Sequence, residues 1–496
     1  MSNFASTLEY PSLFIQCNYI DGKWTSSGSG TTFDVVNPAD NEVIGSAPES
    51  TEEDLHVAIQ AASRAFPLWR ALSGRQRGRI LSKVFQLLLE NKQDLGKIIL
   101  AENGKATGDA EGEVVFAASF FEWFAEEAAR AYGSVVPHSN ATFRTQVVKE
   151  PVGVCGLITP WNFPLAMGAR KIAAAMAAGC TVVLKSDGLT PFSSTALALL
   201  CERAGVPKGV INVVNSLKTT PQLGLAMCES PIIKKISFTG STRVGKLLMK
   251  QSSETLKKLS LELGGNAPFI VFDDADVEVA VASALVSKFK VTGQTCVCAN
   301  RIYVQDAIYD SFSKRLVEEV SKFKVGDGRD PTVTHGPLTT GTYRVEAQIR
   351  DAAAKGARIL LGGRKLLKVG ENFHELTILG DVPTSAVITT EETFGPVAAL
   401  FRFTAEEEVI NKANTSDVGL ASYVMTSDLS RFYRISERLQ FGMVACNTGI
   451  ISDAAAPFGG VKHSGLGREG SKYGLDDYMV LKTVVVGGIN TIHSLL

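Results

Sequence analysis

Apolar residues recur at helical spacing in three stretches near the start of the chain. The first begins near Thr51 with acidic residues at 52–54 and continues through Phe66. The other two cover Arg75 to Glu90 and Glu111 to Ala131. Acidic residues in a first turn, followed by apolar side chains three and four positions apart, are typical of amphipathic helices. The pattern therefore predicts three helices in this part of the chain.

The pattern changes between residues 134 and 151. Residues that favour β-strands lie there on both sides of a polar tip at Ser139 and Asn140, which predicts an exposed hairpin arm. The tail from Asp477 to Gly488 also has the composition of a strand. We expect this tail to pair with the arm or with a neighbouring subunit.

Short apolar runs alternate with helical stretches after Pro151. The first series contains the runs GVCGLI, TVVL, GVINVV and KKISF, and the second contains PFIVF, RIYV, VAALF and GLASYV. Strands that are apolar throughout and separated by helices form parallel sheets buried on both faces. The sequence therefore predicts an α/β protein with two Rossmann-like domains, each built on a parallel sheet, and a small β arm.

The two series meet at Gly264 and Gly265, where we place the domain boundary. A chain of 496 residues has room for two to four domains at roughly 100 to 200 residues each, and for a cleft between them. The expected division is residues 1–133 and 152–263 for the first domain, 264–462 for the second, and 134–151 with 470–490 for the arm and tail.

Charge and hydropathy exclude several classes of protein. The chain has 50 Lys+Arg and 51 Asp+Glu, so bulk electrostatics does not favour binding to nucleic acid or to a membrane surface. The longest apolar stretch, 172–184, is interrupted by polar and small residues and is shorter than the ~20 residues that span a bilayer. The N-terminal residues of the chain show no secretory or mitochondrial signal. We expect no nucleic-acid or membrane partner and a cytoplasmic location.

Cysteine and histidine usage argues against a disulfide framework or a metal centre. The 8 Cys are scattered, and Cys296 and Cys298 are their one close pair. The 6 His include no HExxH motif and no close pair. We expect no metal site and a reducing compartment.

Three segments carry candidate chemistry, although each is also compatible with ordinary packing. GQTCVCANR places Cys296 among small polar residues just before a strand, where a thiol can face a cleft. LELGG places Glu262 beside the Gly pair at the domain boundary. FTGSTRVGK, with Gly240 and Ser241, follows a strand and opens a helix, and the free N–H groups of that first turn suit a pyrophosphate. Lys185 ends another strand, at a position where loops of parallel sheets meet ligands.

Eight segments together resemble the ordered motif set of the NAD(P)-dependent aldehyde dehydrogenase superfamily. In chain order between residues 158 and 478 they are ITPWNFP, VVLKSDGLTPFSS, SFTGSTRVGK, LELGG, GQTCVCANR, EETFGP, NTG and PFGGVKHSGLGREGSKYGLDDY. The last segment and the CVC triplet are most similar to the succinate-semialdehyde dehydrogenases. The resemblance implies the aldehyde dehydrogenase fold, with the first domain binding NAD or NADP, and a homo-oligomer, a dimer or a tetramer.

The activity that the resemblance implies is oxidation of succinate semialdehyde to succinate with NAD(P)+, a step of 4-aminobutyrate degradation. A broader dehydrogenase for aliphatic aldehydes or other ω-carboxyl semialdehydes, such as glutarate semialdehyde, is the alternative. A noncatalytic NAD(P)-binding relic of the fold is a further one, and so is an enzyme that transfers the acyl group to coenzyme A.

The motifs also imply roles for individual residues. Cys296 matches the nucleophile that forms a thiohemiacetal and then a thioester, Glu262 the general base, and Asn162 the amide that holds the oxyanion. The residues implied for cofactor binding are Trp161, Lys185, Ser186, Gly240, Ser241, Glu392 and Phe394.

Two departures from the family pattern change the expected specificity. Gly188 stands where strict NAD users carry a Glu that accepts hydrogen bonds from the adenosine ribose, so no carboxylate at that position repels a 2′-phosphate and NADP becomes an expected cofactor. The nearby Asp187 leaves the preference open. Arg170 and Ser452 match residues that hold the distal carboxylate of the substrate. A second family Arg is replaced by Lys290, which keeps the charge and loses the planar fork.

Cys298 has two interpretations. It is a small buried residue, or it forms a reversible disulfide with Cys296, as in family members that carry the CVC triplet. Such a bond would remove the thiolate and switch the enzyme off.

Overall fold

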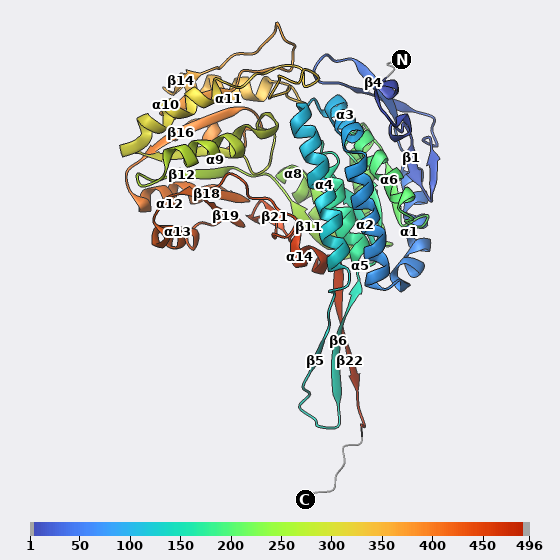
Figure 1. Cartoon of the computed structure of the whole chain (residues 1–496). Helices are drawn as coiled ribbons and strands as arrows, with labels where there is room; N and C mark the ends of the chain where they lie inside the picture. Colours follow the sequence, from blue (N-terminus) through green and yellow to red (C-terminus); the bar gives the residue numbers. More distant parts are fainter. Residues whose placement is uncertain (1–3, 490–496) are drawn as a thin grey trace, which may run out of the picture.

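The computed structural model describes residues 4–489, which form two α/β lobes and an arm that projects from them (Figure 1). The first lobe is built on an eight-stranded sheet of order β2-β1-β9-β8-β7-β10-β11-β21. The five strands from β9 to β11 are parallel, and β1 and β21 add antiparallel edges. The strands are β1 (Asn18–Ile20), β2 (Lys23–Thr25), β7 (Val154–Ile158), β8 (Thr181–Lys185), β9 (Ile211–Val214), β10 (Ile233–Thr239), β11 (Lys258–Glu262) and β21 (Gly465–Leu466).

Helices cover both faces of this sheet. One face packs against α1 (Glu52–Ala71), α7 (Thr220–Glu229) and α8 (Thr242–Ser252). The other face packs against α5 (Ala166–Ala178) and α6 (Phe192–Arg203), and α2 (Gly74–Glu90), α3 (Lys92–Asn103) and α4 (Thr107–Glu127) form an outer layer on these two helices. Val182 and Leu184 of β8 belong to the second core and Val183 to the first. Because alternate side chains enter opposite cores, the three central residues of the strand are all apolar.

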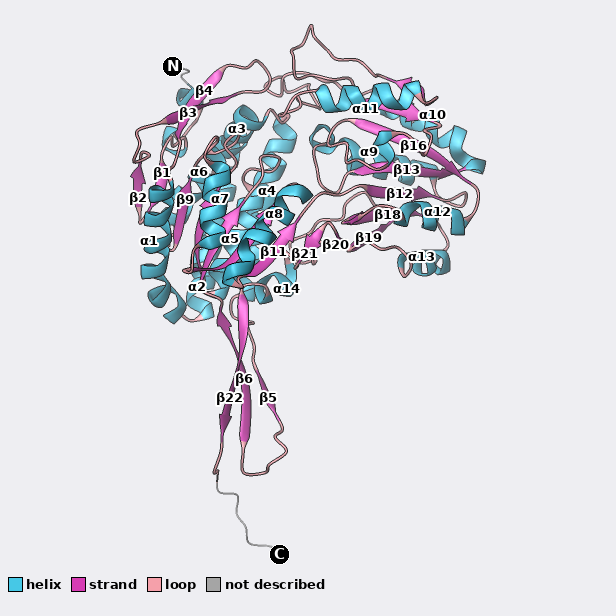
Figure 2. Cartoon of the chain, turned by 180° about the vertical axis from the view of Figure 1, so that it is seen from behind, coloured by secondary structure: helices cyan, strands magenta, loops and turns pink. Residues whose placement is uncertain are grey.

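The second lobe repeats this arrangement on a seven-stranded sheet of order β14-β15-β16-β13-β12-β18-β19 (Figure 2). Helices α9 (Val277–Phe289) and α10 (Tyr309–Val320) pack on one face, and α11 (Tyr343–Ala354), α12 (Glu406–Asn414) and α13 (Leu429–Ser436) on the other. The strands are β12 (Ala267–Val271), β13 (Ala299–Gln305), β14 (Arg358–Leu361), β15 (Thr377–Gly380), β16 (Val397–Phe403), β18 (Ala421–Met425) and β19 (Met443–Cys446).

The arm is a three-stranded antiparallel sheet of order β22-β6-β5. β5 (Ser134–Val136) and β6 (Arg144–Pro151) form a hairpin, and β22 (Met479–Val486) pairs with β6 along its whole length, from Met479 opposite Pro151 to Val486 opposite Arg144. The tail strand therefore pairs with the arm of its own chain. Residue 490 of the expected tail lies outside the described residues.

The remaining elements are short. The pairs β3 (Thr32–Val36) with β4 (Val43–Pro48), and β17 (Val418–Gly419) with β20 (Val461–Lys462), form two-stranded sheets, and α14 (Ser471–Asp476) leads into β22. The 3-10 helices are η1 (Phe4–Thr7), η2 (Pro11–Leu13), η3 (Ser253–Thr255), η4 (Lys290–Gly293), η5 (Asp306–Ile308) and η6 (Val387–Thr389). No helix within residues 4–489 has the length and hydrophobicity to cross a membrane.

The structure differs from the sequence expectation at the end of the first helix. The apolar spacing was expected to end at Phe66, but α1 runs to Ala71 and contains Pro67. The last turn carries Trp69, which is buried and donates its indole N–H to the Met176 carbonyl at 3.1 Å. We infer that this burial outweighs the cost of proline inside the helix.

Candidate active site

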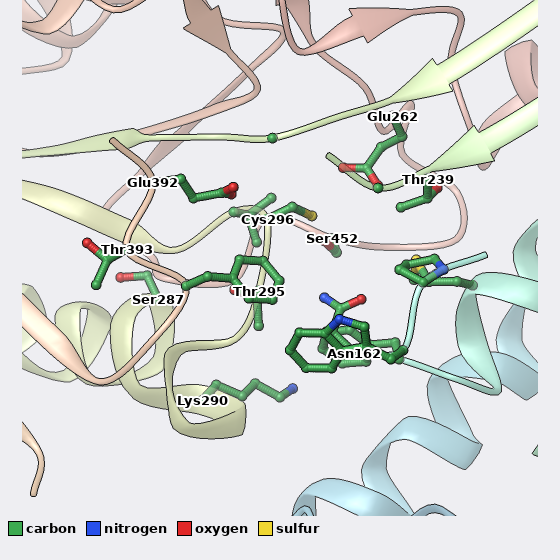
Figure 3. Close-up of a pocket in the computed structure, with 18 of the residues that line it drawn as sticks. Asn162, Thr239, Glu262, Ser287, Lys290, Thr295, Cys296, Glu392, Thr393 and Ser452 are labelled. Atoms are coloured by element: carbon green, nitrogen blue, oxygen red, sulfur yellow. The ribbon is translucent and has the colours of Figure 1, made fainter. Parts of the chain in front are cut away.

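A cleft of about 560 Å³ lies between the two lobes, at the carboxyl ends of β7, β10 and β11. Loops that leave parallel strands at the same edge of a sheet converge, which explains why residues far apart in sequence meet here. Most of the residues singled out from the sequence line this one cleft, and several of them are labelled in Figure 3: Trp161, Asn162, Arg170, Gly240, Ser241, Glu262, Lys290, Cys296, Glu392, Phe394 and Ser452.

Cys296 and Glu262 lie close together in the cleft (Figure 3). Glu262 is the last residue of β11, is 3% exposed, and neither carboxylate oxygen has a hydrogen-bond partner among the described residues. Burial raises the pKa of this carboxyl, and Arg170 opposes the shift. Burial and the Glu262 carboxylate raise the pKa of the Cys296 thiol well above its usual value. A nucleophilic thiolate therefore needs a proton acceptor, and the free carboxylate oxygens beside it can supply one.

Asn162 follows β7 and is also buried. Its amide Nδ2 donates to the carbonyl of Gln294, two residues before Cys296, at 3.0 Å. An amide NH₂ group has two N–H bonds, so the second remains for a carbonyl oxygen bound beside Cys296. The arrangement can stabilise an oxyanion.

Cys298 does not line the cleft. It is 1% exposed, and its Sγ donates to the Gly293 carbonyl at 3.2 Å and lies 3.0 Å from the Thr295 hydroxyl. Both contacts belong to the loop that carries Cys296, so a Cys296–Cys298 disulfide would require this loop to rearrange. The disulfide stays a prediction.

The turn between β10 and α8 has the geometry of a phosphate site. Ser241 is the N-cap of α8 and accepts the N–H of Val244 at 3.4 Å. A Cβ on Gly240 would lie 2.5 Å from the Phe238 ring, so a larger residue here would require that ring to move. The first N–H groups of an 11-residue helix lie beside the cleft and suit a pyrophosphate.

The opposite wall of the cleft carries Glu392 and Phe394. Glu392 accepts the N–H of Gly265 at 3.0 Å, and burial raises the pKa of its carboxyl to about 7. The Phe394 ring packs edge-on against Trp161, with centroids 5.5 Å apart. Carboxylate, aromatic rings and helix terminus together fit a dinucleotide.

Lys185 and Ser186 lie beyond the cleft lining, at the carboxyl end of β8. Burial lowers the pKa of the Lys185 ammonium to about 8. Ser186 donates its hydroxyl to Asn215 at 2.9 Å, which leaves Lys185 as the stronger donor for a ligand. A Cβ on Gly188 would lie 2.7 Å from the Ser216 carbonyl oxygen, so this loop position does not fit a glutamate without a backbone shift.

Arg170 lies on α5 and is 2% exposed. Its Nε is 2.5 Å from Glu469 Oε2, its Nη2 is 3.8 Å from Glu262 Oε2, and its guanidinium lies over the Phe458 ring. Lys171 pairs with the other oxygen of Glu469. Burial alone would raise the pKa of Glu469, but Arg170 and Lys171 outweigh it and lower that pKa.

Glu469 was not singled out from the sequence, although it lies inside the PFGGVKHSGLGREG segment that carried the resemblance. It holds one edge of the Arg170 guanidinium. Lys290 and Ser452 line the same cleft, and Lys290 is exposed at the start of η4. Within residues 4–489, no three His, Cys, Asp or Glu side chains are grouped so that they could hold a metal ion.

Comparisons with known proteins agree with this geometry. Residues 24–484 match the model of the aldehyde dehydrogenase family. The chain is 51% identical to a succinate-semialdehyde dehydrogenase [NADP(+)] of Saccharomyces cerevisiae over 97% of each chain, and 50% identical to a glutarate-semialdehyde dehydrogenase of Pseudomonas aeruginosa over 96% of this chain and 99% of the other. The crystal structure of succinate-semialdehyde dehydrogenase from Burkholderia pseudomallei superposes with a TM-score of 0.96 at 49% identity, covering 97% of this chain and all of that one. Because the family match covers nearly the whole chain and the motif residues meet in one cleft, this protein belongs to the aldehyde dehydrogenase family.

Proposed function

We propose that this enzyme oxidises succinate semialdehyde to succinate with NAD(P)+. The observation that carries the substrate class is the buried guanidinium of Arg170, which lies in the same cleft as Cys296 together with Lys290 and Ser452. A buried cation near a reacting carbonyl favours a substrate with an anionic far end. Relatives with about 50% identity act on ω-carboxyl semialdehydes, which supports this assignment.

Cys296 adds to the aldehyde carbonyl and forms a thiohemiacetal. The thiol proton leaves to a base, for which the Glu262 carboxylate is in place, and the second N–H of Asn162 donates to the oxyanion. One such donor is typically worth about 3 to 4 kcal/mol of the barrier. NAD(P)+, when bound, supplies the hydride acceptor, and Cys296 is left as a thioester.

Glu262 completes the cycle. The proton that Glu262 took from the thiol first leaves to solvent, which regenerates the carboxylate. This carboxylate then accepts a proton from water as that water attacks the thioester, the Cys296 thiolate leaves, and the product is a free acid. Glu262 accepts no hydrogen bond within the described residues and has Arg170 at 3.8 Å as its ion-pair partner, so its oxygens can accept a proton from water, which supports this role over transfer to coenzyme A. Burial keeps the carboxyl at a raised pKa, which suits a general base.

The residues proposed to bind the pyrophosphate and the nicotinamide ribose line the same cleft. Gly240, Ser241 and the N-terminus of α8 would hold the pyrophosphate, Glu392 the nicotinamide ribose hydroxyls, and Phe394 with Trp161 the packing around that ribose. Lys185, with Ser186 beside it, would hold the adenosine end. The packing at Gly188 supports NADP, because no carboxylate fits there to repel a 2′-phosphate.

We also propose that the arm joins subunits in a homodimer or homotetramer. β22 carries exposed apolar residues, and β5 presents two exposed valines at the far edge of the same sheet: Val135, Val136, Leu481, Val484, Val485 and Val486. Such an edge favours pairing with another chain.

The 8 cysteines are all free thiols, which supports a reducing compartment such as the cytoplasm.

Steady-state kinetics with succinate semialdehyde, glutarate semialdehyde and butanal, each with NAD+ and NADP+, tests this function. We expect the highest kcat/KM for succinate semialdehyde. The alternative, a glutarate-semialdehyde dehydrogenase, is favoured by the Pseudomonas aeruginosa relative, and a higher kcat/KM for the longer substrate would establish it. Equal values for butanal and both acids would overturn the ω-carboxyl assignment.

A further inference from the structure

Helix α5 begins directly after the Asn162 loop and has no cap of its own. Its N-cap residue is Leu165, which has no side chain that can accept the free N–H groups of the first turn. Every residue of α5 is buried, so water does not satisfy these groups. A helix start of this kind needs a partner from elsewhere in the chain.

Glu113 of α4 supplies that partner. Its Oε1 accepts the N–H of Leu165 at 2.9 Å and that of Ala166 at 3.1 Å, across 52 and 53 residues of sequence. A carboxylate at this place also interacts favourably with the positive end of the helix dipole. Glu113 is 2% exposed, and its other oxygen pairs with the buried ammonium of Lys105.

Two further contacts, from Asn103 at the end of α3 and from Lys105, hold the Asn162 loop. The ammonium of Lys105 lies 4.1 Å from the centroid of the Phe163 ring, and the Asn103 amide donates to the Trp161 carbonyl at 3.0 Å. The residues on both sides of Asn162, and the helix that follows, are thus tied to the α3–α4 region. Asn162 itself donates to Gln294 in the loop of Cys296.

We infer that Glu113 is a positioning residue for Asn162: by capping α5 from α4, it fixes the loop that presents the Asn162 amide to the reacting carbonyl. This inference rests on the oxyanion role proposed for Asn162. It assigns Glu113 no contact with the reacting atoms, although the side chain borders the cleft.

Glu113→Gln is the informative substitution. A glutamine has one carbonyl oxygen, so it can accept from the α5 amides or from Lys105 but not from both. The paired variant Lys105→Met with Glu113→Gln removes the buried charge that would compete for this oxygen and restores the acceptor to α5. The pair therefore serves as the rescue.

Glu102 offers a matched control. It is 1% exposed and also caps a helix start, that of α6, accepting the N–H of Phe192 at 2.7 Å through Oε2 and that of Ser193 at 3.0 Å through Oε1, so Glu102→Gln too leaves one acceptor oxygen for two sets of donors. α6 follows the Lys185 loop and carries no side chain of the cleft. Glu102→Gln should therefore lower thermal stability and leave kcat at saturating cofactor within about twofold of the wild type.

The experiment measures kcat/KM for succinate semialdehyde and for butanal at saturating cofactor, with melting temperatures for every variant. Loss of one oxyanion donor costs roughly 100- to 1000-fold, so a displaced donor should cost less. We expect Glu113→Gln to lower kcat/KM about tenfold, by the same factor for both aldehydes. The paired variant, Lys105→Met with Glu113→Gln, should recover most of the lost kcat/KM.

The double-mutant cycle with Asn162→Ala decides between positioning and general stability. In the Asn162→Ala background, Glu113→Gln should change kcat/KM by less than about twofold, because the group it positions is gone. A full tenfold loss in that background, or an unchanged kcat/KM in Glu113→Gln alone, would overturn the inference. A loss confined to succinate semialdehyde would overturn it too, because it would mean direct contact with the carboxylate. If Asn162→Ala itself leaves kcat/KM unchanged, the proposed oxyanion role fails instead.

Discussion

In the proposed mechanism, both halves of the reaction depend on Glu262. Its carboxylate is buried without a hydrogen-bond partner in the described structure, and this burial costs free energy. Such a group is typical of a site of proton transfer. Cys296, in contrast, must lose a proton before it reacts, because the pKa of its thiol is raised. The two assignments can be separated by kinetics.

Glu262→Gln should slow both half-reactions, but hydrolysis of the thioester more than its formation, because a thiol loses its proton to solvent far more readily than water does. We expect a burst of NAD(P)H close to one equivalent per active site, followed by a steady state slowed at least 100-fold, and mass spectrometry should find the acylated enzyme. Cys296→Ala is the control and should show neither burst nor turnover while still binding cofactor. A Glu262→Gln enzyme with normal steady-state turnover would place the base elsewhere.

If Lys185 holds the adenosine end of the cofactor as proposed, cofactor binding should depend on pH. Burial lowers the pKa of its ammonium to about 8, so the cation is present below that pH and is lost as the pH rises through it. The Kd for NADP+, measured by calorimetry, should be flat below about pH 8 and rise above it. Lys185→Met should bind more weakly and lose this rise. A rise that persists in Lys185→Met would show that another group titrates.

At the scale of elements, the parallel strands and the helices between them follow from the sequence because periodicity is strong where both faces of a sheet are buried. The alternation of Val182, Val183 and Leu184 between two cores is an example. Strands β1 to β4 were not predicted, since they are short or lie at edges where the pattern is weak. Helix α3 was not predicted either, because it is buried over most of its length and lacks a clear polar face. The role of Glu113 could not be predicted either, because it depends on a contact 52 residues away.

The motif residues that meet in the cleft were accessible from the sequence because the segments that carry them occur in the order typical of the family. What the sequence did not show is how each is held. Glu469 pairs with both Arg170 and Lys171, and Ser186 is engaged by Asn215. These partners come from other elements, so only the folded chain reveals them.

A substitution at Gly188 tests whether the preference between NADP+ and NAD+ depends on one side chain or on the conformation of the loop. Because a Cβ there would lie 2.7 Å from the Ser216 carbonyl oxygen and 2.9 Å from the Leu217 Cα, a glutamate must displace backbone. We expect Gly188→Glu to lower kcat/KM at least tenfold for NADP+ without raising it for NAD+, and to lower the melting temperature. A clean switch to NAD+ at unchanged stability would show that the loop accommodates the side chain.

At the scale of the whole molecule, the arm is the part that a single chain leaves most exposed. Leu481 is 70% and Val485 50% exposed, both on β22. We expect light scattering at micromolar concentration to give a dimer or tetramer, and Leu481→Asp with Val485→Asp to shift it toward the monomer. The matched substitution Leu429→Asp, at an exposed leucine of α13, should not. A monomeric wild type would contradict the assembly.

We propose that the cleft recognises an aldehyde with a distal carboxylate through Arg170. The most direct test is the ratio of kcat/KM for succinate semialdehyde to that for butanal, before and after Arg170→Ala. A charge-assisted contact in a buried site is worth about 2 to 5 kcal/mol, so we predict a fall of roughly 30-fold to several thousand-fold for succinate semialdehyde. Arg170 also contacts Glu469 and Glu262, but any loss from those contacts is common to both substrates and cancels in the ratio. If both substrates lose the same factor, Arg170 supports the fold of the site and the proposed carboxylate recognition is wrong.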